Sequence, residues 1–294
     1  MKHFALRFIL CATVAIILSL NASAQTGLGQ VKAAKVEGEV TKVVNGQPVA
    51  IKVGDSLHET DVIATGKNSS VVLVFENGSS IKLGADSRLA IDEFKIDPLA
   101  PGTSMAGLTA EPTVSKTALN LSYGELVGDV KKLNKSSTYS IKTPVGAAGI
   151  RGTIFRIVFR PDSTGKAFFT VSTADGHVVM EGVTTQEIPI DTGKEVVVTV
   201  DIPTAPTTPG EAPPPPAAPV IVTQDIPAAT QTLITAASIT ISQSVQQTTF
   251  TPTPPTPPPE TPPPTEPKKE ETPPPTPPPA NQPAPLTLTP GAGG

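Results

Sequence analysis

Proline divides this chain into two parts with different folding potential. Of the 35 prolines, 7 precede residue 203 and 28 lie within residues 203–294, in runs such as TPTPPTPPPETPPP. Proline has no backbone amide hydrogen, so such runs cannot form a helix or a sheet ladder and adopt extended polyproline conformations. We therefore predict a disordered, proline-rich tail over 203–294 and a folded domain in the residues before it.

One stretch of this tail, VIVTQDIPAATQTLITAASITISQSVQQTTF at 220–250, is poor in proline. Leu233, Ala236, Ala237, Thr240 and Ile241 recur at helical spacing, whereas the many threonines and isoleucines favour a strand. A short helix near 230–247 is one interpretation, because that segment contains neither proline nor glycine. A loosely structured spacer is the alternative, and the sequence leaves both open.

The first 24 residues have the three parts of a signal peptide. Lys2 and Arg7 give a basic start, residues 8–20 form an apolar run of 13, and Ala22-Ser23-Ala24 is a cleavage site. At about 1.5 Å per helical residue, this run is too short for a hydrocarbon layer of about 30 Å, which disfavours a membrane anchor. We expect an exported, soluble mature protein in the periplasm or at the cell surface, with no transmembrane span.

The single cysteine, Cys11, would be removed with the signal peptide. The mature chain then has no disulfide, no thiolate metal site and no thiol nucleophile, so its stability has to come from an apolar core. The net charge of −4, without a basic cluster, argues against a nucleic-acid partner. Two tyrosines and no tryptophan disfavour an aromatic platform for sugars.

Residues 31–202 consist of short alternating segments separated by turn signals. The dipeptides Asn45-Gly46 and Asn77-Gly78 each stand between two apolar runs, and both residue types tolerate the positive φ of a hairpin turn. In the second hairpin, Val72, Val74, Ile81 and Leu83 are expected to alternate with polar neighbours. Further strands are predicted in SIKTPV, TIFRIVFR, AFFTVSTADGHVVMEG and KEVVVTVDI.

Turn signals recur about every ten residues in this region, which is typical of all-β folds. We predict a single domain over 31–202 that is a β-sandwich or is β-solenoid-like. Residues 98–116 break the rhythm with proline and glycine and are expected to form a long loop or insertion.

An arginine stands between two glycines in the run TPVGAAGIRGTIFRI at 143–157. If the alternation of the following strand continues backward from Phe155, Arg151 lies on the buried side. Buried arginines need carboxylates or carbonyls as partners, so the first interpretation of Arg151 is a structural one, in which it ties neighbouring loops together. A bulge at Gly152 would reverse the alternation of buried and exposed positions and place Arg151 on the exposed side. The alternative interpretation of Arg151 is contact with a partner molecule.

These residues resemble the signature of FecR domains, T-P followed by V-R-G-T-x-F. The residues that match it, each of structural or partner-contact importance, are Thr143, Pro144, Gly149, Arg151, Gly152, Thr153 and Phe155. Other stretches resemble the family in the same order, namely VGDSL at 53–57, DVIATG at 61–66, FENGS at 75–79, YGEL at 123–126, DGHV at 175–178 and TGKE at 192–195. Together the resemblance covers about residues 38–200.

The resemblance implies an all-β, extracytoplasmic domain that is not an enzyme. In the best-known members of the family, such a domain relays a signal from an outer-membrane transporter to a sigma factor. For this chain, we expect an exported module that binds an envelope protein or serves as a signal-relay scaffold.

The residues themselves indicate no catalytic site, cofactor or metal. His58 and His177 lie far apart in the sequence and lack metal-ligand spacing. Asp92 and Glu93 would point to opposite faces of a strand, which prevents shared acid–base chemistry. Asp55, Asp61 and Asp86 lie in turns, where capping explains them better than calcium binding.

Two further functions remain possible from the sequence. The first is binding of a cell-wall polysaccharide, with the proline-rich tail as a spacer. The second is hydrolysis of wall material, although no motif supports it.

Overall fold

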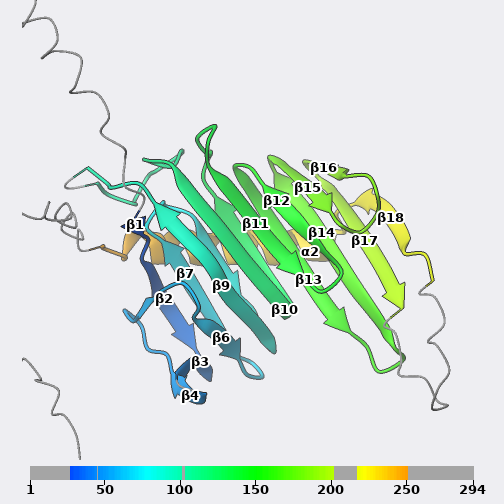
Figure 1. The fold of residues 1–294 in the computed structure, drawn as a ribbon, viewed down its shortest axis with the longest axis horizontal. Coiled ribbons are helices and arrows are strands. Elements are labelled where there is room, and N and C mark those ends of the chain that lie inside the picture. The colour runs from blue at the N-terminus through cyan, green and yellow to red at the C-terminus, as the bar shows by residue number, and fades with distance from the viewer. Residues whose placement is uncertain (1–26, 45, 101–102, 202–216, 251–294) are drawn as a thin grey trace, which may run out of the picture. The chain divides into compact units, whose positions relative to one another are not determined.

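The protein is described by a computed structural model that covers residues 27–44, 46–100, 103–201 and 217–250 (Figure 1). These residues belong to one compact unit. The first half contains strands β1 (Gly27–Leu28), β2 (Val31–Glu37), β3 (Val40–Val44), β4 (Gln47–Ala50), β5 (Ser56–Leu57), β6 (Val62–Thr65), β7 (Ser70–Phe75), β8 (Ser80–Leu83) and β9 (Ser87–Ile96). The second half contains β10 (Ser115–Val130), β11 (Thr138–Thr143), β12 (Gly146–Ile150), β13 (Thr153–Pro161), β14 (Lys166–Asp175), β15 (His177–Glu181), β16 (Ile188–Asp191), β17 (Lys194–Asp201), β18 (Val220–Asp225) and helix α2 (Ala228–Gln246).

The strands form two sheets that share β10. Sheet A has the order β4-β3-β6-β9-β10-β11-β12-β15-β16, and β1 also pairs with the far end of β9. Sheet B has the order β5-β2-β7-β8-β10-β13-β14-β17-β18. Every pairing is antiparallel except that of β10 with β11.

The strand β10 passes from one sheet to the other at Gly124. Its residues 115–123 pair in sheet A with β9, and its residues 124–130 pair in sheet B with β13. Gly124 has a φ of +117°, and a Cβ at this position would lie 2.5 Å from Cα of Ser87. Only glycine combines this backbone conformation with so close an approach.

The main core lies between the two sheets. Alternate residues of the strands point inward, which follows from the two-residue period of a strand. The largest fully buried side chains are Phe75, Phe94, Phe155 and Phe169, and the rings of Phe75 and Phe94 meet edge to face at 5.1 Å. The prediction of an all-β domain with sandwich-like packing is therefore confirmed.

Helix α2 covers the outer face of sheet B and adds a third layer (Figure 1). Its buried face presents Ile234, Ala237, Ile241 and Val245. These side chains pack on the outward residues of sheet B, which include Val72, Val74 and Val127. The helix is rich in β-branched residues and has no side-chain cap, so tertiary packing rather than local propensity stabilises it.

The structure extends the folded unit beyond the residue 202 boundary predicted from the sequence. β18 pairs with β17, and α2 packs on sheet B, so 220–250 is not part of an unstructured tail. Leu233 and Ala236, which suggested the helical spacing, lie on its exposed face. The segments 1–24, 203–216 and 251–294, for which we predict a signal peptide and a proline-rich tail, lie outside the described residues.

Both expected hairpins are present, but the second is buried differently from the prediction. β3 pairs with β4, and β7 pairs with β8. Ile81 and Leu83 face the main core, whereas Val72 and Val74 face α2. The strand β7 has the continuous apolar sequence VVLVF after Ser70, which fits a strand that is covered on both faces.

The expected long connection between β9 and β10 is also present, and part of it is tied to the β7–β8 hairpin. The Asn77 side chain donates a hydrogen bond to Oγ of Ser115 (3.0 Å), which in turn donates to Oε2 of Glu111 (2.8 Å). Leu108 lies over Gly78. In the described part of the chain, no helix is long and apolar enough to cross a membrane.

Candidate interaction surfaces

The FecR-like signature begins in the hairpin between β11 and β12. The Thr143 hydroxyl donates to the carbonyl oxygen of Gly146 (2.9 Å) and accepts from the Val145 amide (3.4 Å). Pro144 occupies the turn, where its fixed φ favours the reversal. Gly149 lies inside β12, between Ser140 of β11 and Val179 of β15. These residues shape the hairpin.

Arg151 and Gly152 carry the chain from sheet A to sheet B. β12 ends at Ile150 in sheet A, and β13 begins at Thr153 in sheet B. Gly152 has a φ of +69°, and a Cβ there would lie 3.0 Å from Cα of Lys132. Glycine is therefore required at this crossing.

The signature ends with two anchors in the fold. The Thr153 hydroxyl donates to the carbonyl oxygen of His177 (3.0 Å), which joins the start of β13 to the start of β15. Phe155 is fully buried, and its ring lies against Gly128 of β10, where any Cβ would overlap it. Thr143, Pro144, Gly149, Gly152, Thr153 and Phe155 all serve the structure.

The expectation that Arg151 is buried is wrong. Its side chain is exposed, and it makes one hydrogen bond, from Nη2 to the carbonyl oxygen of Lys135 at 3.3 Å. The count from Phe155 assumed a strand that continues back through Arg151, but β13 begins at Thr153, and Arg151 lies in the crossing between β12 and β13. Arg151 and Pro144 are the exposed residues of the signature, and Arg151 is the one of the seven that presents a charged side chain to solvent.

Arg151→Ala is therefore expected to lower the free energy of unfolding by no more than about 1 kcal/mol, because exposed substitutions rarely cost more. The measurement is chemical denaturation of the purified chain. Arg156→Ala is the matched control: that side chain is 15% exposed, and its Nε donates to Oε1 of Glu125 at 2.8 Å. A loss at Arg151 as large as that at Arg156 would contradict the exposed position.

Two lysines lie beside Arg151 and make this corner positively charged. Lys132 approaches Gly152 through its backbone, and the carbonyl of Lys135 accepts the Arg151 hydrogen bond. The side chains of Arg151, Lys132 and Lys135 are exposed, and within the described residues no carboxylate pairs with any of them. We call these three residues the cationic corner. In a chain of net charge −4, it is a local site that attracts anionic groups.

The strands at the ends of the sheets are a second kind of interaction surface. Sheet A ends in β4 and β16, which contain Pro48 and Pro189. Sheet B ends in β5, of only two residues, and in β18, of six residues without proline. Unpaired edges can accept a strand from another molecule.

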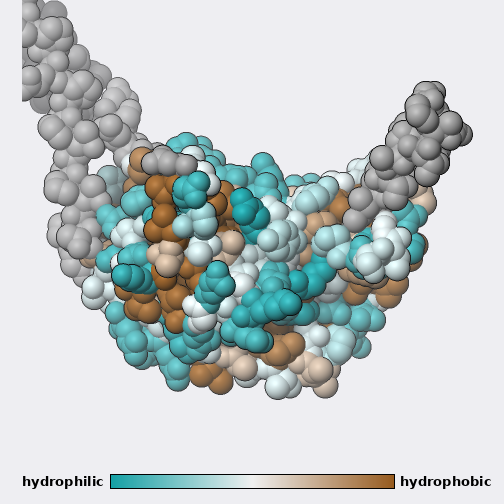
Figure 2. Space-filling model, turned by 90° about the horizontal axis from the view of Figure 1, so that it is seen from below, coloured by the Kyte–Doolittle hydropathy of each residue, from teal (hydrophilic) through white to brown (hydrophobic). Residues whose placement is uncertain are grey.

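Exposed apolar residues gather near β3 and β4. Figure 2 shows hydrophobic surface over the end of the domain that carries these strands. The residues involved are Val43, Val44, Val49 and Val53, of which Val53 is 63% exposed. Pro48 removes one amide from this edge, which limits strand addition there.

The residues considered for chemistry do not converge. His58 lies in the turn after β5, whereas His177 begins β15 and contacts Asp191 at 3.1 Å. Asp55 and Asp61 each accept a backbone amide, from Lys52 and His58 respectively, as turn caps do. Within the ranges that the structure describes, no group of three or more His, Cys, Asp or Glu is placed to hold a metal ion.

Two buried titratable groups lie at the end of the core near the β7–β8 hairpin. Burial raises the pKa of the Glu76 carboxyl, against a hydrogen bond from the Gln30 amide that lowers it. Burial alone raises the pKa of Tyr139, whose ring lies 6.4 Å from that of Phe75. Neither was singled out from the sequence, and both positions belong to the core rather than to an open site.

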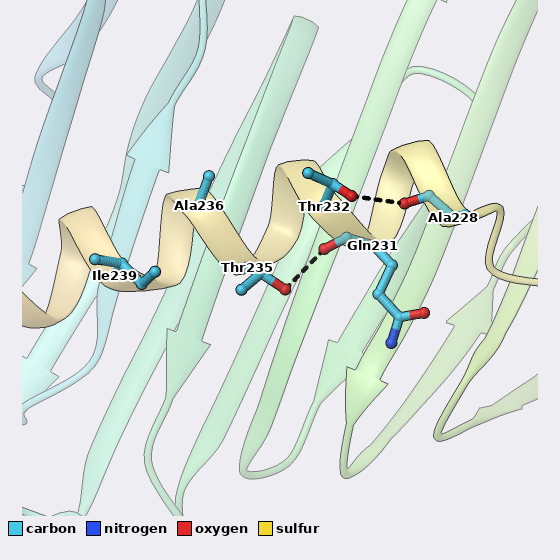
Figure 3. Close-up of a pocket in the computed structure, with 6 residues that line it drawn as sticks. All are labelled: Ala228, Gln231, Thr232, Thr235, Ala236 and Ile239. Carbon is cyan, nitrogen blue, oxygen red and sulfur yellow. Dashed lines mark hydrogen bonds between the residues drawn. The ribbon is translucent and has the colours of Figure 1, made fainter.

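A hollow lies on the outer face of α2 (Figure 3). Its walls come from this helix alone, and all of its residues are exposed. The hydroxyls of Thr232 and Thr235 donate to the carbonyls of Ala228 and Gln231, one turn earlier, and so bind within the helix. The hollow therefore has no enclosing partner and no polar group directed at a ligand.

Comparison with known proteins relates part of the chain to one family. Residues 61–179 match the family described as FecR protein. Two crystal structures of a putative anti-sigma factor from Parabacteroides distasonis ATCC 8503 are similar at 13% and 14% sequence identity, each with a TM-score of 0.38. Each comparison covers 58% of this chain and 62% of the other, so this chain spans less than two thirds of their length.

No curated protein matches the chain. The family match contains all seven signature residues, from Thr143 to Phe155, together with the β7–β8 hairpin and the sheet crossing at Gly124. The resemblance to the FecR family indicated by the sequence motifs is confirmed by this match over residues 61–179.

Proposed function

We propose that this chain is an exported, non-enzymatic FecR-like module that binds another protein at the cell envelope and acts as a regulatory or signal-relay scaffold. The FecR domain over 61–179 supports a regulatory role through protein contacts. The basic start, the 13-residue apolar run and the small-residue cleavage site at 1–24 support export.

The observation that carries this proposal is that the residues of the signature have two different roles. Six of its seven residues shape the hairpin, the crossing and the core, while Arg151 projects into solvent beside Lys132 and Lys135. Guanidinium groups bind carboxylates through paired hydrogen bonds, and neighbouring cations speed the approach of an acidic partner. The cationic corner therefore suits an acidic protein surface.

Charge reversal at the corner tests the proposal. We expect the full chain, crosslinked in intact cells of its source, to be recovered with a protein attached, and Arg151→Glu to reduce that yield at least about tenfold, equivalent to about 1.4 kcal/mol of binding free energy. Lys52→Glu is the control, because it makes the same charge change at an exposed position in the β4–β5 connection.

Three results would contradict the proposal. Equal yields of crosslinked partner from Arg151→Glu and Lys52→Glu would show that the cationic corner does not take part in binding. Sedimentation with purified wall polymer, without a protein partner, would favour polysaccharide binding instead. Recovery of the mature chain only from the cytoplasmic fraction would refute export.

A further inference from the structure

We infer that β18 is a docking edge, to which the partner adds an extended, uncharged strand with alternating apolar residues. The inference rests on the proposed function, because it requires the partner to be a protein. It concerns sheet B and is independent of the cationic corner.

The choice of β18 follows from comparing the four outermost strands. β4 and β16 carry Pro48 and Pro189, and β5 has two residues. β18 runs for six residues, VIVTQD, with prolines only outside it, at positions 219 and 227. Proline within an edge strand is a common protection against unwanted pairing, and β18 lacks it.

The hydrogen-bond pattern shows which groups of β18 are available. The Ile226 amide donates to the carbonyl oxygen of Gly193 (3.0 Å), so bonded pairs alternate from there along β17 and β18. By this alternation, Val220, Val222 and Gln224 bond to β17, while the amides and carbonyls of Ile221 and Thr223 point outward. A strand placed beside β18 would bond to those outward groups.

Pro48 supports this interpretation by its position in the other edge. The Ile51 amide donates to the carbonyl of Val40, so the same alternation places the backbone nitrogen of residue 48 on the outward side of β4. The edge strand β4 thus has no outward amide hydrogen at Pro48, whereas the edge strand β18 has one at Thr223. The difference between the two edges is one of sequence rather than of geometry.

The side chains of β18 indicate what kind of strand it would accept. Val220 and Val222 are 62% and 48% exposed. Val222 continues a cross-strand row on the outer face of sheet B, through Val197 and Thr170 to Val158. An added strand would place its own apolar side chains beside this row, because cross-strand neighbours share a face.

The charges near β18 favour an uncharged partner strand. Asp225 is its only charged residue, and it pairs with Lys194 of β17 at 2.7 Å. The hydrogen bond that Lys194 donates to this carboxylate lowers the pKa of Asp225. A charged residue opposite Val220 or Val222 would lose hydration without gaining an ion pair.

The first test uses a synthetic peptide of alternating valine and threonine, with a control peptide in which lysine replaces each valine. Amide hydrogen exchange is measured on the full chain with each peptide. We expect the first peptide alone to slow exchange at Ile221 and Thr223 at least tenfold. Unchanged exchange at these amides, or equal protection by both peptides, would overturn the inference.

The second test compares Thr223→Pro with Thr223→Ala. The proline removes an outward amide that β17 does not use, so unfolding midpoints close to that of the parent chain are expected for both variants. Thr223→Pro should lose the peptide protection and reduce the crosslinked partner at least tenfold, whereas Thr223→Ala should retain both. If Thr223→Pro fails to fold, Val222→Lys, which places a charge on the exposed row, is expected to give the same two losses.

The outcomes separate this inference from the proposed function. If a protein partner is captured equally by Thr223→Pro and Thr223→Ala, the docking edge is refuted and the proposed function stands. If no protein is captured by the parent chain, the proposed function fails first. If protection at Ile221 and Thr223 appears without peptide and rises with protein concentration, a second copy occupies the edge and the inference is overturned.

Discussion

Phe155→Ala is expected to lower the free energy of unfolding by about 3–5 kcal/mol, the usual cost of truncating a buried phenylalanine. Its side chain has no exposed surface and fills the space above Gly128 of β10. The surrounding strands are paired on both sides, so they cannot close the resulting cavity. The measurement is the denaturation midpoint, with its slope checked for two-state unfolding.

Phe168→Ala is the control for that experiment. Phe168 belongs to the neighbouring strand β14 and is 38% exposed on the outer side of sheet B. Its truncation should cost less than about 1.5 kcal/mol, because little cavity is created. Similar losses for both variants would mean that the packing between the sheets is not what stabilises the domain.

Gly124→Ala is expected to cost more than about 3 kcal/mol, through two effects at the point where β10 changes sheets. The φ of +117° is unfavourable for any residue with a Cβ. The new methyl group would also collide with Ser87, whose hydroxyl accepts from the Glu125 amide (3.0 Å) and donates to the carbonyl of Ala85 (3.0 Å). Displacing Ser87 would break both hydrogen bonds.

Gly193→Ala separates the two effects. Gly193 has a φ of +81°, but no atom lies within 4 Å of the position of an added Cβ. It should therefore cost only about 1–2 kcal/mol, from backbone conformation alone. Thermal unfolding of both variants gives the comparison, and equal losses would show that the contact with Ser87 does not constrain the crossing.

Several features of the fold were predictable because they depend on short-range patterns. Alternating apolar residues identified strands, and Asn-Gly dipeptides identified two hairpins, since both signals act over a few residues. The order of the short motifs was sufficient to relate the chain to FecR domains.

Other features depended on contacts between distant residues. Val72 and Val74 lie under a helix more than 150 positions later in the chain, and no local pattern shows this covering. Leu233 looked like part of a helical core face, yet Ile234 is buried instead, because the position of sheet B decides which side of α2 is covered.

The candidate site shows the same limit. The sequence determined that 143–155 is a FecR-like signature with an unusual arginine, but it could not determine whether Arg151 is buried. That depended on where the chain leaves sheet A for sheet B, and the crossing at Gly152 places the guanidinium in solvent. Residue periodicity is set by neighbours along the chain, whereas exposure is set by which strands, far apart in sequence, pair to bury apolar surface.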